Sequence, residues 1–190
     1  DFNYMYKIKG KLDENFINRN IEIDNFLKEN SNLIIVFHYR WALKFLEKFF
    51  DNEEGYTEGH REGDNLEFYS YLEPINIKTS SLKERQQYIK EALISQINKI
   101  INQGHKLVLV YQVPEMGLNP RRYLFRKYFY NKNLFKNSIP VFSGSYEVYK
   151  NRNKLIFEIL DSIENPSIYR VYPHTLFCDT TIRDRCVAND

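Results

Sequence analysis

The chain has 190 residues, of which 43% are hydrophobic and 16% aromatic, so a disordered chain is excluded and a domain with its own core is expected. Its formal net charge of +2 excludes the global positive field that draws proteins to nucleic acid. No apolar run approaches the roughly 18 residues needed to span a bilayer, and the N-terminal stretch lacks the layout of a signal peptide.

The first predicted elements are a helix followed by a strand. Residues 12–29 carry apolar side chains at helical spacing, namely Phe16, Ile23, Phe26 and Leu27. The run NLIIVF at 32–37 is nearly continuous in apolar and β-branched residues, which predicts a buried strand.

Residues 50–81 do not fit the alternation of helices and strands along the chain. In this stretch the acids Asp51, Glu53, Glu54, Glu58, Glu62, Asp64, Glu67 and Glu73 outnumber the fixed cations Arg61 and Lys78. A long, acidic connection of this kind is typical of an excursion over the surface.

A second helix and strand follow. Apolar residues recur every three or four positions over 81–103, with Ser80 or Ser81 as the N-cap and Gly104 as the residue just beyond the end. The run KLVLVYQV at 106–113 predicts the next strand.

The last predicted pair is a helix over 146–163 and a strand over 167–172. Ser145 is the expected N-cap, and the Asn-Pro pair at 165–166 ends the helix. Because helices and strands alternate along the chain, we predict an α/β fold with a parallel sheet, right-handed crossovers and helices covering the sheet.

In open α/β sheets, functional side chains collect beyond the carboxyl ends of the strands. Three stretches lie there: HYRW at 38–41, VPEMG at 113–117 and PH at 173–174. His38 and His174 are candidates for an acid, a base or a ligand, and Glu115 could orient a histidine. The alternative for each residue is a polar side chain that merely finishes a strand.

No sequence motif for a phosphate loop, a nucleophile elbow, a zinc protease or a redox dithiol is present. We therefore predict neither a metal site nor a cofactor.

The order and spacing of several segments nevertheless resemble a known family. These segments are IIVFHYRWAL, then a long loop, GHKLVLVYQVPEMGLNP, a helix, and VYPHTLFCDTTIRDRC. Together, over about residues 12 to 188, they resemble the SGNH domain fused to acyltransferase-3 membrane proteins. The resemblance implies a three-layer, flavodoxin-like fold with helices on both faces, formed by residues 1–190 as a single domain.

The resemblance also implies acyl transfer through a covalent acyl-serine, with a histidine as base and an aspartate fixing its tautomer. Such proteins O-acylate cell-surface polysaccharides such as O-antigen, and acetyl is the expected acyl group. SGNH enzymes carry the serine in an early Gly-Asp-Ser block and the base in a late Asp-x-x-His block. Neither block is in this sequence. We therefore expect a truncated domain that is inactive by itself.

Three residues remain as candidates on the substrate side. Arg40 and Trp41 match the Arg-Trp pair of the acyltransferase-fused branch, and Glu115 lies in the Val-Pro-Glu turn. Arg40 could steer an anionic or sugar substrate, or support the charge that develops during acyl transfer. An ion pair between Arg40 and an acid of the 50–81 connection is an equally open interpretation.

The resemblance implies a location for the chain: the periplasmic side of the bacterial inner membrane, beside a membrane-embedded acyltransferase domain and a polysaccharide acceptor. Cys178 and Cys186 are then expected to form a disulfide, because the periplasm is oxidising. A zinc site is excluded as an alternative, because the tail offers no two further ligands.

A basic, aromatic segment over 117–138 completes the analysis, with Arg121, Arg122, Arg126 and Lys127 at its centre. Binding to single-stranded nucleic acid is not expected for a periplasmic domain. We interpret the segment as a surface facing the membrane or the acyltransferase part. The alternative is an ordinary helix with aromatic residues in the core. For the whole chain, the alternative function is a noncatalytic glycan- or protein-binding domain.

Overall fold

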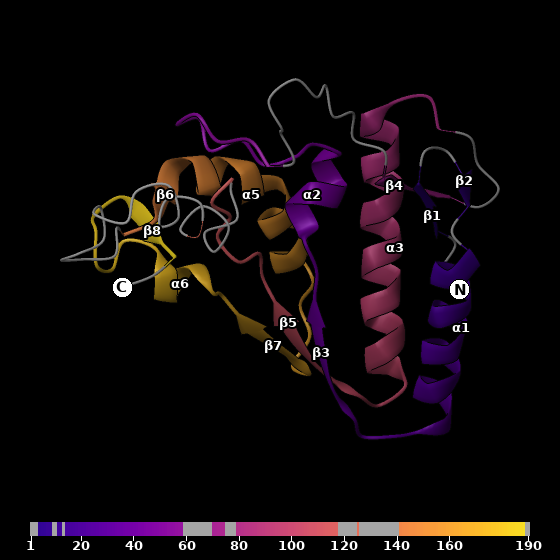
Figure 1. Cartoon of the computed structure of the whole chain (residues 1–190). Coiled ribbons are helices and arrows are strands. Elements are labelled where there is room, and N and C mark those ends of the chain that lie inside the picture. Colours follow the sequence, from indigo (N-terminus) through magenta and orange to yellow (C-terminus); the bar gives the residue numbers. More distant parts are fainter. Residues whose placement is uncertain are drawn as a thin grey trace. The chain divides into compact units, whose positions relative to one another are not determined.

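The computed structural model describes residues 4–8, 11–12, 14–58, 70–74, 79–117, 125 and 141–188, and every structural statement below refers to these (Figure 1). The elements in chain order are β1 (Tyr4–Ile8), β2 (Lys11–Leu12), α1 (Glu14–Glu29), β3 (Ile34–His38), α2 (Trp41–Leu46), β4 (Ser70–Pro74), α3 (Leu82–Asn102), β5 (Lys106–Val110), β6 (Ser143–Ser145), α5 (Tyr146–Asp161), β7 (Ile168–Val171), α6 (His174–Phe177) and β8 (Arg185–Val187).

The chain divides into two compact units. The first consists of Asp1–Lys48, Glu67–Gln112 and Leu155–Val171, and the second of Phe49–Leu66, Val113–Lys154 and Tyr172–Asp190. Each unit is described by itself.

The first unit is built on a three-stranded parallel sheet in the order β3-β5-β7. Val36 pairs with Val108, and Val108 pairs with Tyr169, so the register runs across all three strands. These are the three strands predicted from the apolar runs, and the α/β prediction with a parallel sheet is confirmed. β5 ends at Val110, three residues before the predicted end.

The core of the first unit lies against one face of this sheet. Leu107 and Leu109 of β5 are fully buried, as are Ile97 of α3 and Leu160 of α5. Burying one such aliphatic side chain stabilises the fold by about 1.5–3 kcal/mol. Helices α3 and α5 are therefore held by their apolar stripes, as the three-to-four spacing predicted. On α1 the prediction was wrong for Ile23 and Phe26, which are exposed, whereas Leu27 is buried.

Helix α3 begins and ends at the predicted residues. Ser81 is its N-cap, and the Ser81 hydroxyl accepts a hydrogen bond from the Glu84 amide at 3.2 Å. The Glu84 carboxylate in turn accepts from the amide and hydroxyl of Ser80, at 2.7 and 2.8 Å. Gly104 follows the helix with a φ of 84°, a conformation that glycine adopts without a steric cost.

Helix α1 is joined to the rest of the unit by polar contacts. Lys99 of α3 donates to both carboxylate oxygens of Asp24, at 2.6 and 2.7 Å. The buried His105 accepts the Leu33 amide at Nδ1, so its Nε2 carries the proton and donates to the Leu27 carbonyl at 3.0 Å. His105 thereby fixes the end of α1 beside the start of β5.

A second sheet in this unit was not predicted. It is antiparallel in the order β2-β1-β4, with Tyr6 of β1 opposite Leu72 of β4. β4 lies inside the 50–81 stretch that the sequence indicated as a surface connection. Strands this short leave a period-two signal that is too brief to separate from a loop.

The second unit contains the other short sheet, in which β6 pairs antiparallel with β8. β6 leads directly into α5, and the Ser145 hydroxyl accepts a hydrogen bond from the Val148 amide at 3.3 Å, as expected of the predicted N-cap. Helix α5 ends at Asp161, two residues before the predicted end.

Candidate functional site

In the first unit, Trp41 holds the carboxyl ends of two strands together. Its indole Nε1 donates to the Val110 carbonyl at 3.0 Å, and its ring meets Phe37 edge-on at 5.2 Å. The side chain is only 3% exposed. The indole N–H of Trp41 is therefore already hydrogen-bonded within the protein. His38 Nδ1 lies 3.5 Å from the same Val110 carbonyl oxygen.

Arg40 precedes this buried tryptophan and is exposed. It occupies the N-cap position of α2, with its backbone carbonyl accepting the Lys44 amide at 3.4 Å. The edge of the sheet where β3 ends is where α/β folds bind ligands, so the Arg40 side chain stands at a suitable place for a substrate contact. This role stays a prediction.

In the second unit, Glu115 forms an ion pair with Arg152 of α5, with 3.0 Å between Glu115 Oε2 and Arg152 Nε. The two side chains are only 10% and 8% exposed. Arg152 also donates to the Phe49 carbonyl at 3.4 Å and stacks over the Phe50 ring at 5.3 Å. Because Arg152 lies 37 residues from Glu115, no sequence pattern identified it as the partner.

His174 lies among aromatic rings of the same unit. The ring centroids of Tyr149, Tyr172 and Tyr146 are 5.6, 5.9 and 6.1 Å from that of His174. Burial lowers the pKa of His174 below its usual value of 6.5, which favours the uncharged imidazole at neutral pH. Burial likewise raises the pKa of Tyr149, with smaller contributions from Tyr146 and Glu115.

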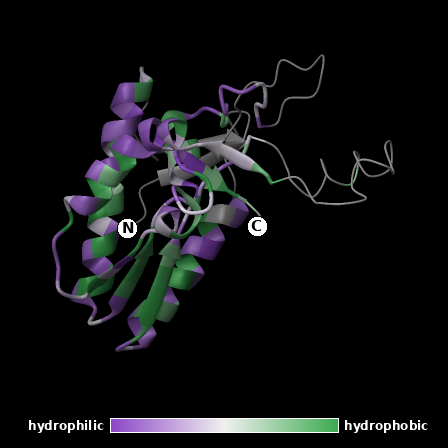
Figure 2. Ribbon diagram, turned by 90° about the vertical axis from the view of Figure 1, so that its left-hand side faces the viewer, coloured by the Kyte–Doolittle hydropathy of each residue, from purple (hydrophilic) through white to green (hydrophobic). Residues whose placement is uncertain are grey.

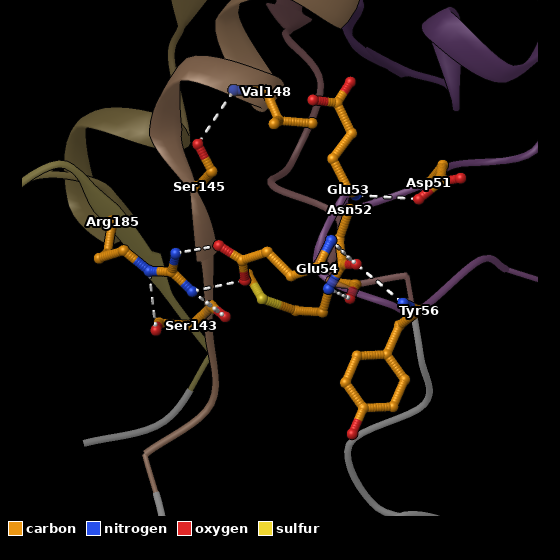
Figure 3. A network of polar contacts seen from close by, with 10 residues as sticks. Asp51, Asn52, Glu53, Glu54, Tyr56, Ser143, Ser145, Val148 and Arg185 are labelled. Atoms are coloured by element: carbon orange, nitrogen blue, oxygen red, sulfur yellow. Dashed lines mark hydrogen bonds and ion pairs between the residues drawn. The ribbon is translucent and has the colours of Figure 1, made fainter.

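A polar network joins the C-terminal segment to the loop after Asp51 (Figure 3). Arg185 of β8 binds the Glu54 carboxylate through both terminal nitrogens, with 2.8 Å between Nη2 and Oε2. Its Nε donates to the Ser143 hydroxyl at 3.1 Å, and Nη2 donates to the Ser143 carbonyl at 2.9 Å. Arg185 thus contacts β6 and the acidic loop at once.

The loop that carries Glu54 is shaped by its own residues. Asn52 Oδ1 accepts the amides of Glu54 and Tyr56, each at 2.9 Å (Figure 3). Gly117 packs so closely that a Cβ there would lie 2.4 Å from the Tyr56 carbonyl oxygen, and its φ is 75°. A side chain at position 117 would displace this loop.

Cys178 and Cys186 form a disulfide, as predicted. Both are buried. The Asp179 amide donates to the Arg185 carbonyl at 2.8 Å inside the closed loop, so the disulfide and this hydrogen bond together fix the residue that binds Glu54.

Other predicted features lie outside the described residues. Arg121, Arg122, Arg126 and Lys127 belong to that part, and of the 117–138 segment the structure describes Gly117 and Phe125, the latter with an exposed side chain. Within the described ranges, no cluster of His, Cys, Asp and Glu side chains could hold a metal ion. Across the same ranges, none of the helices combines the length and apolar character that crossing a membrane requires.

A parallel sheet with crossover helices, and candidate side chains at the carboxyl ends of its strands, defines a flavodoxin-like α/β domain. The family model of the SGNH domain (fused to AT3 domains) matches residues 3–189. The chain therefore belongs to this family of SGNH domains, and the resemblance read from the sequence is confirmed. No curated protein and no solved structure matches the chain.

Proposed function

We propose that the chain is the SGNH part of a membrane acyltransferase that O-acylates, and in the first instance O-acetylates, a cell-surface polysaccharide. The observation that carries this proposal is the family match over residues 3–189, since SGNH domains of this family are fused to AT3 domains. The fused acyltransferase part supplies the membrane association.

The Cys178–Cys186 disulfide supports a periplasmic position for the domain. Disulfides form and persist in oxidising compartments and are rare in the cytosol. In the periplasm the domain would lie on the same side of the inner membrane as the proposed polysaccharide acceptor.

The reaction divides between this chain and residues supplied from outside it. Acyl transfer through an acyl-serine requires a serine nucleophile, a histidine base and an oxyanion site. The sequence contains neither a Gly-Asp-Ser block nor an Asp-x-x-His pair. The chain contributes the scaffold and contacts to the acceptor, whereas the nucleophile and base come from another segment.

We assign to Arg40 one of two roles: a contact with the polysaccharide acceptor, or stabilisation of the charge that develops during acyl transfer. Its guanidinium is permanently charged and can donate two parallel hydrogen bonds to a carboxylate or to neighbouring sugar oxygens. The buried Trp41 next to it holds β3 and β5 together and so fixes the backbone from which Arg40 projects. In the other unit, Glu115 is held by Arg152.

The basic segment with Arg121, Arg122, Arg126 and Lys127 is assigned to the membrane surface or the acyltransferase part. Cations meet anionic head groups, and the interleaved Tyr and Phe suit the interface. Replacing Arg121, Arg122 and Arg126 by Glu should weaken binding to vesicles containing anionic phospholipid, with a salt dependence. Binding that stays unchanged would remove this assignment.

The test of the acyltransferase proposal is the O-acetyl content of surface polysaccharide, measured by NMR in cells that carry the complete gene or lack the region coding for this domain. We expect the O-acetyl signals to disappear on deletion and to return on complementation. Arg40→Ala should reduce them and Arg40→Lys should reduce them less, whereas Lys83→Ala on the exposed start of α3 should not. Unchanged O-acetylation after deletion would instead favour a noncatalytic binding domain.

A further inference from the structure

His38 is a polar residue at the end of an apolar strand. The sequence of β3, Ile34–His38, is IIVFH, and the strands of the parallel sheet are largely hydrophobic in Figure 2. The His38 side chain is exposed. Because α/β folds hold their ligands beyond the carboxyl ends of parallel strands, His38 lies at the edge of the sheet where a ligand is expected.

A contact with the neighbouring strand fixes the tautomer of His38. Its Nδ1 lies 3.5 Å from the carbonyl oxygen of Val110. A carbonyl oxygen accepts hydrogen bonds and cannot donate them, so the proton is on Nδ1. An uncharged imidazole carries one N–H, so the second nitrogen, Nε2, is left with a lone pair. The ring nitrogen that remains for a ligand is therefore a hydrogen-bond acceptor.

The Val110 carbonyl is itself held in place. The indole Nε1 of Trp41 donates to it at 3.0 Å, and Trp41 is only 3% exposed. The oxygen has two lone pairs, so it can accept from Trp41 and from His38 together. His38 and Val110 are also paired in the register of β3 and β5. The orientation of the imidazole is thus set by two strands and a buried tryptophan.

An uncharged nitrogen acceptor suits a hydroxyl group. Arg40, two residues further along, carries only donors, so it can bind the oxygens of a sugar but cannot accept the proton of a sugar hydroxyl. Residues 33–46 contain no carboxylate and no side-chain amide that could accept it instead. His38 therefore supplies the acceptor that Arg40 lacks.

We propose that His38 Nε2 accepts a hydrogen bond from a hydroxyl group of the polysaccharide and so orients the acceptor sugar. The proposal rests on the function proposed above, because that function makes a polysaccharide the ligand. His38 acts by binding and takes no proton during acyl transfer.

Two substitutions separate this contact from a structural role. His38→Asn places an amide where Nδ1 lies, so it keeps a donor for Val110 and removes the acceptor at Nε2. His38→Gln places an amide oxygen near the position of Nε2 and gives up the contact with Val110. A structural role makes Asn the better replacement, whereas a contact with a hydroxyl group makes Gln the better one. Thermal unfolding shows that both variants are folded.

The probe is the surface polysaccharide of cells that carry the gene, isolated and freed of O-acetyl groups with base. It is titrated into the 190-residue chain by isothermal calorimetry. We expect His38→Asn to weaken binding about three- to ten-fold, the effect of losing one hydrogen bond, and His38→Gln to stay within about two-fold of wild type. The proposal is overturned if the wild-type chain does not bind, if His38→Asn binds as wild type does, or if His38→Gln binds no better than His38→Asn.

A measurement on the unliganded chain tests the premise. Long-range proton–nitrogen NMR correlations should show the uncharged His38 with its proton on Nδ1, and a proton on Nε2 would overturn the proposal. Binding that is insensitive to His38→Asn, together with loss of O-acetylation on deletion of the domain, would reject the role of His38 and leave the acyltransferase proposal standing. Binding that depends on His38, with O-acetylation unchanged on deletion, would support the contact in a noncatalytic glycan-binding domain.

Discussion

Glu115 Oε2 lies 3.0 Å from Arg152 Nε, and both side chains are about nine-tenths buried. Arg152→Met should destabilise the fold by about 3–5 kcal/mol, because it leaves the Glu115 carboxylate buried without its partner. The double variant Arg152→Met with Glu115→Leu should cost much less than the sum of the two single variants. Urea denaturation of the four proteins in a double-mutant cycle measures this coupling, and additive effects would show that the pair is not coupled.

Asp24 connects α1 to α3 through Lys99. Burial acts to raise the pKa of Asp24, but hydrogen bonds from Lys99 and Lys28 outweigh it and hold the pKa below the usual 3.8. Because the pKa of Asp24 is lower in the folded than in the unfolded state, its ionised carboxylate stabilises the fold at pH values above the unfolded pKa. This stabilisation is lost as the pH falls through the folded pKa. Asp24→Asn should therefore cost about 1 kcal/mol at pH 7.

The same cost should shrink as the pH is lowered through the acid range, where the wild-type carboxylate takes up its proton. Chemical denaturation of Asp24→Asn and wild type at neutral and acid pH measures it, with Glu22→Gln, exposed on the same helix, as the control. A cost that is the same at both pH values would contradict the role of the ion pair.

His174 should titrate below the usual histidine pKa of 6.5, because burial disfavours its charged form. The unfolded chain then takes up the proton first, so the stability linked to His174 is present above about pH 6.5 and declines as the pH falls. NMR of the imidazole resonances measures the shift, with His174→Gln identifying the signal and the urea-unfolded chain as the reference. A midpoint for His174 in the folded protein at or above that in the unfolded chain would contradict this expectation.

Cys178 and Cys186 are separated by 8 positions in the sequence, so their disulfide closes a loop of nine residues when both cysteines are counted. Replacing both cysteines by Ser should destabilise the fold by about 2.5 kcal/mol in the chain-entropy account. Glu54→Gln, which weakens the partly exposed pair with Arg185, should cost only about 0–1 kcal/mol. Thermal unfolding ranks the two variants, and an equal or larger loss for Glu54→Gln would show that the Arg185 network, rather than the disulfide, holds this segment.

The sequence predicted the elements that have long apolar patterns. The three- and four-residue spacing of α3, its Ser81 cap and Gly104, and the continuous apolar run of β5 each carry a local signal, and each is confirmed. The same reasoning found the Cys178–Cys186 pairing through the family resemblance.

The parts that were missed depend on contacts between distant residues. β4 pairs with β1 across more than sixty residues of chain, from Tyr4 opposite Pro74 to Ile8 opposite Ser70, and neither strand has a recognisable pattern of its own. Glu54 and Arg185 are 131 residues apart, and their pairing follows from how β8 joins β6 rather than from their neighbours in sequence. Partners of this kind become visible only once the chain is folded.

We propose that the nucleophile and base of the reaction lie outside this SGNH chain, and acyl transfer to the purified protein is the direct test of that proposal. The purified 190-residue chain is incubated with p-nitrophenyl acetate, and the release of p-nitrophenol and the intact protein mass are followed together. We expect turnover no higher than that of heat-denatured protein and no acetylated side chain specific to the native fold. Turnover well above that background, abolished by His174→Ala and accompanied by a single acetylated serine, would overturn the proposal and make His174 a catalytic base.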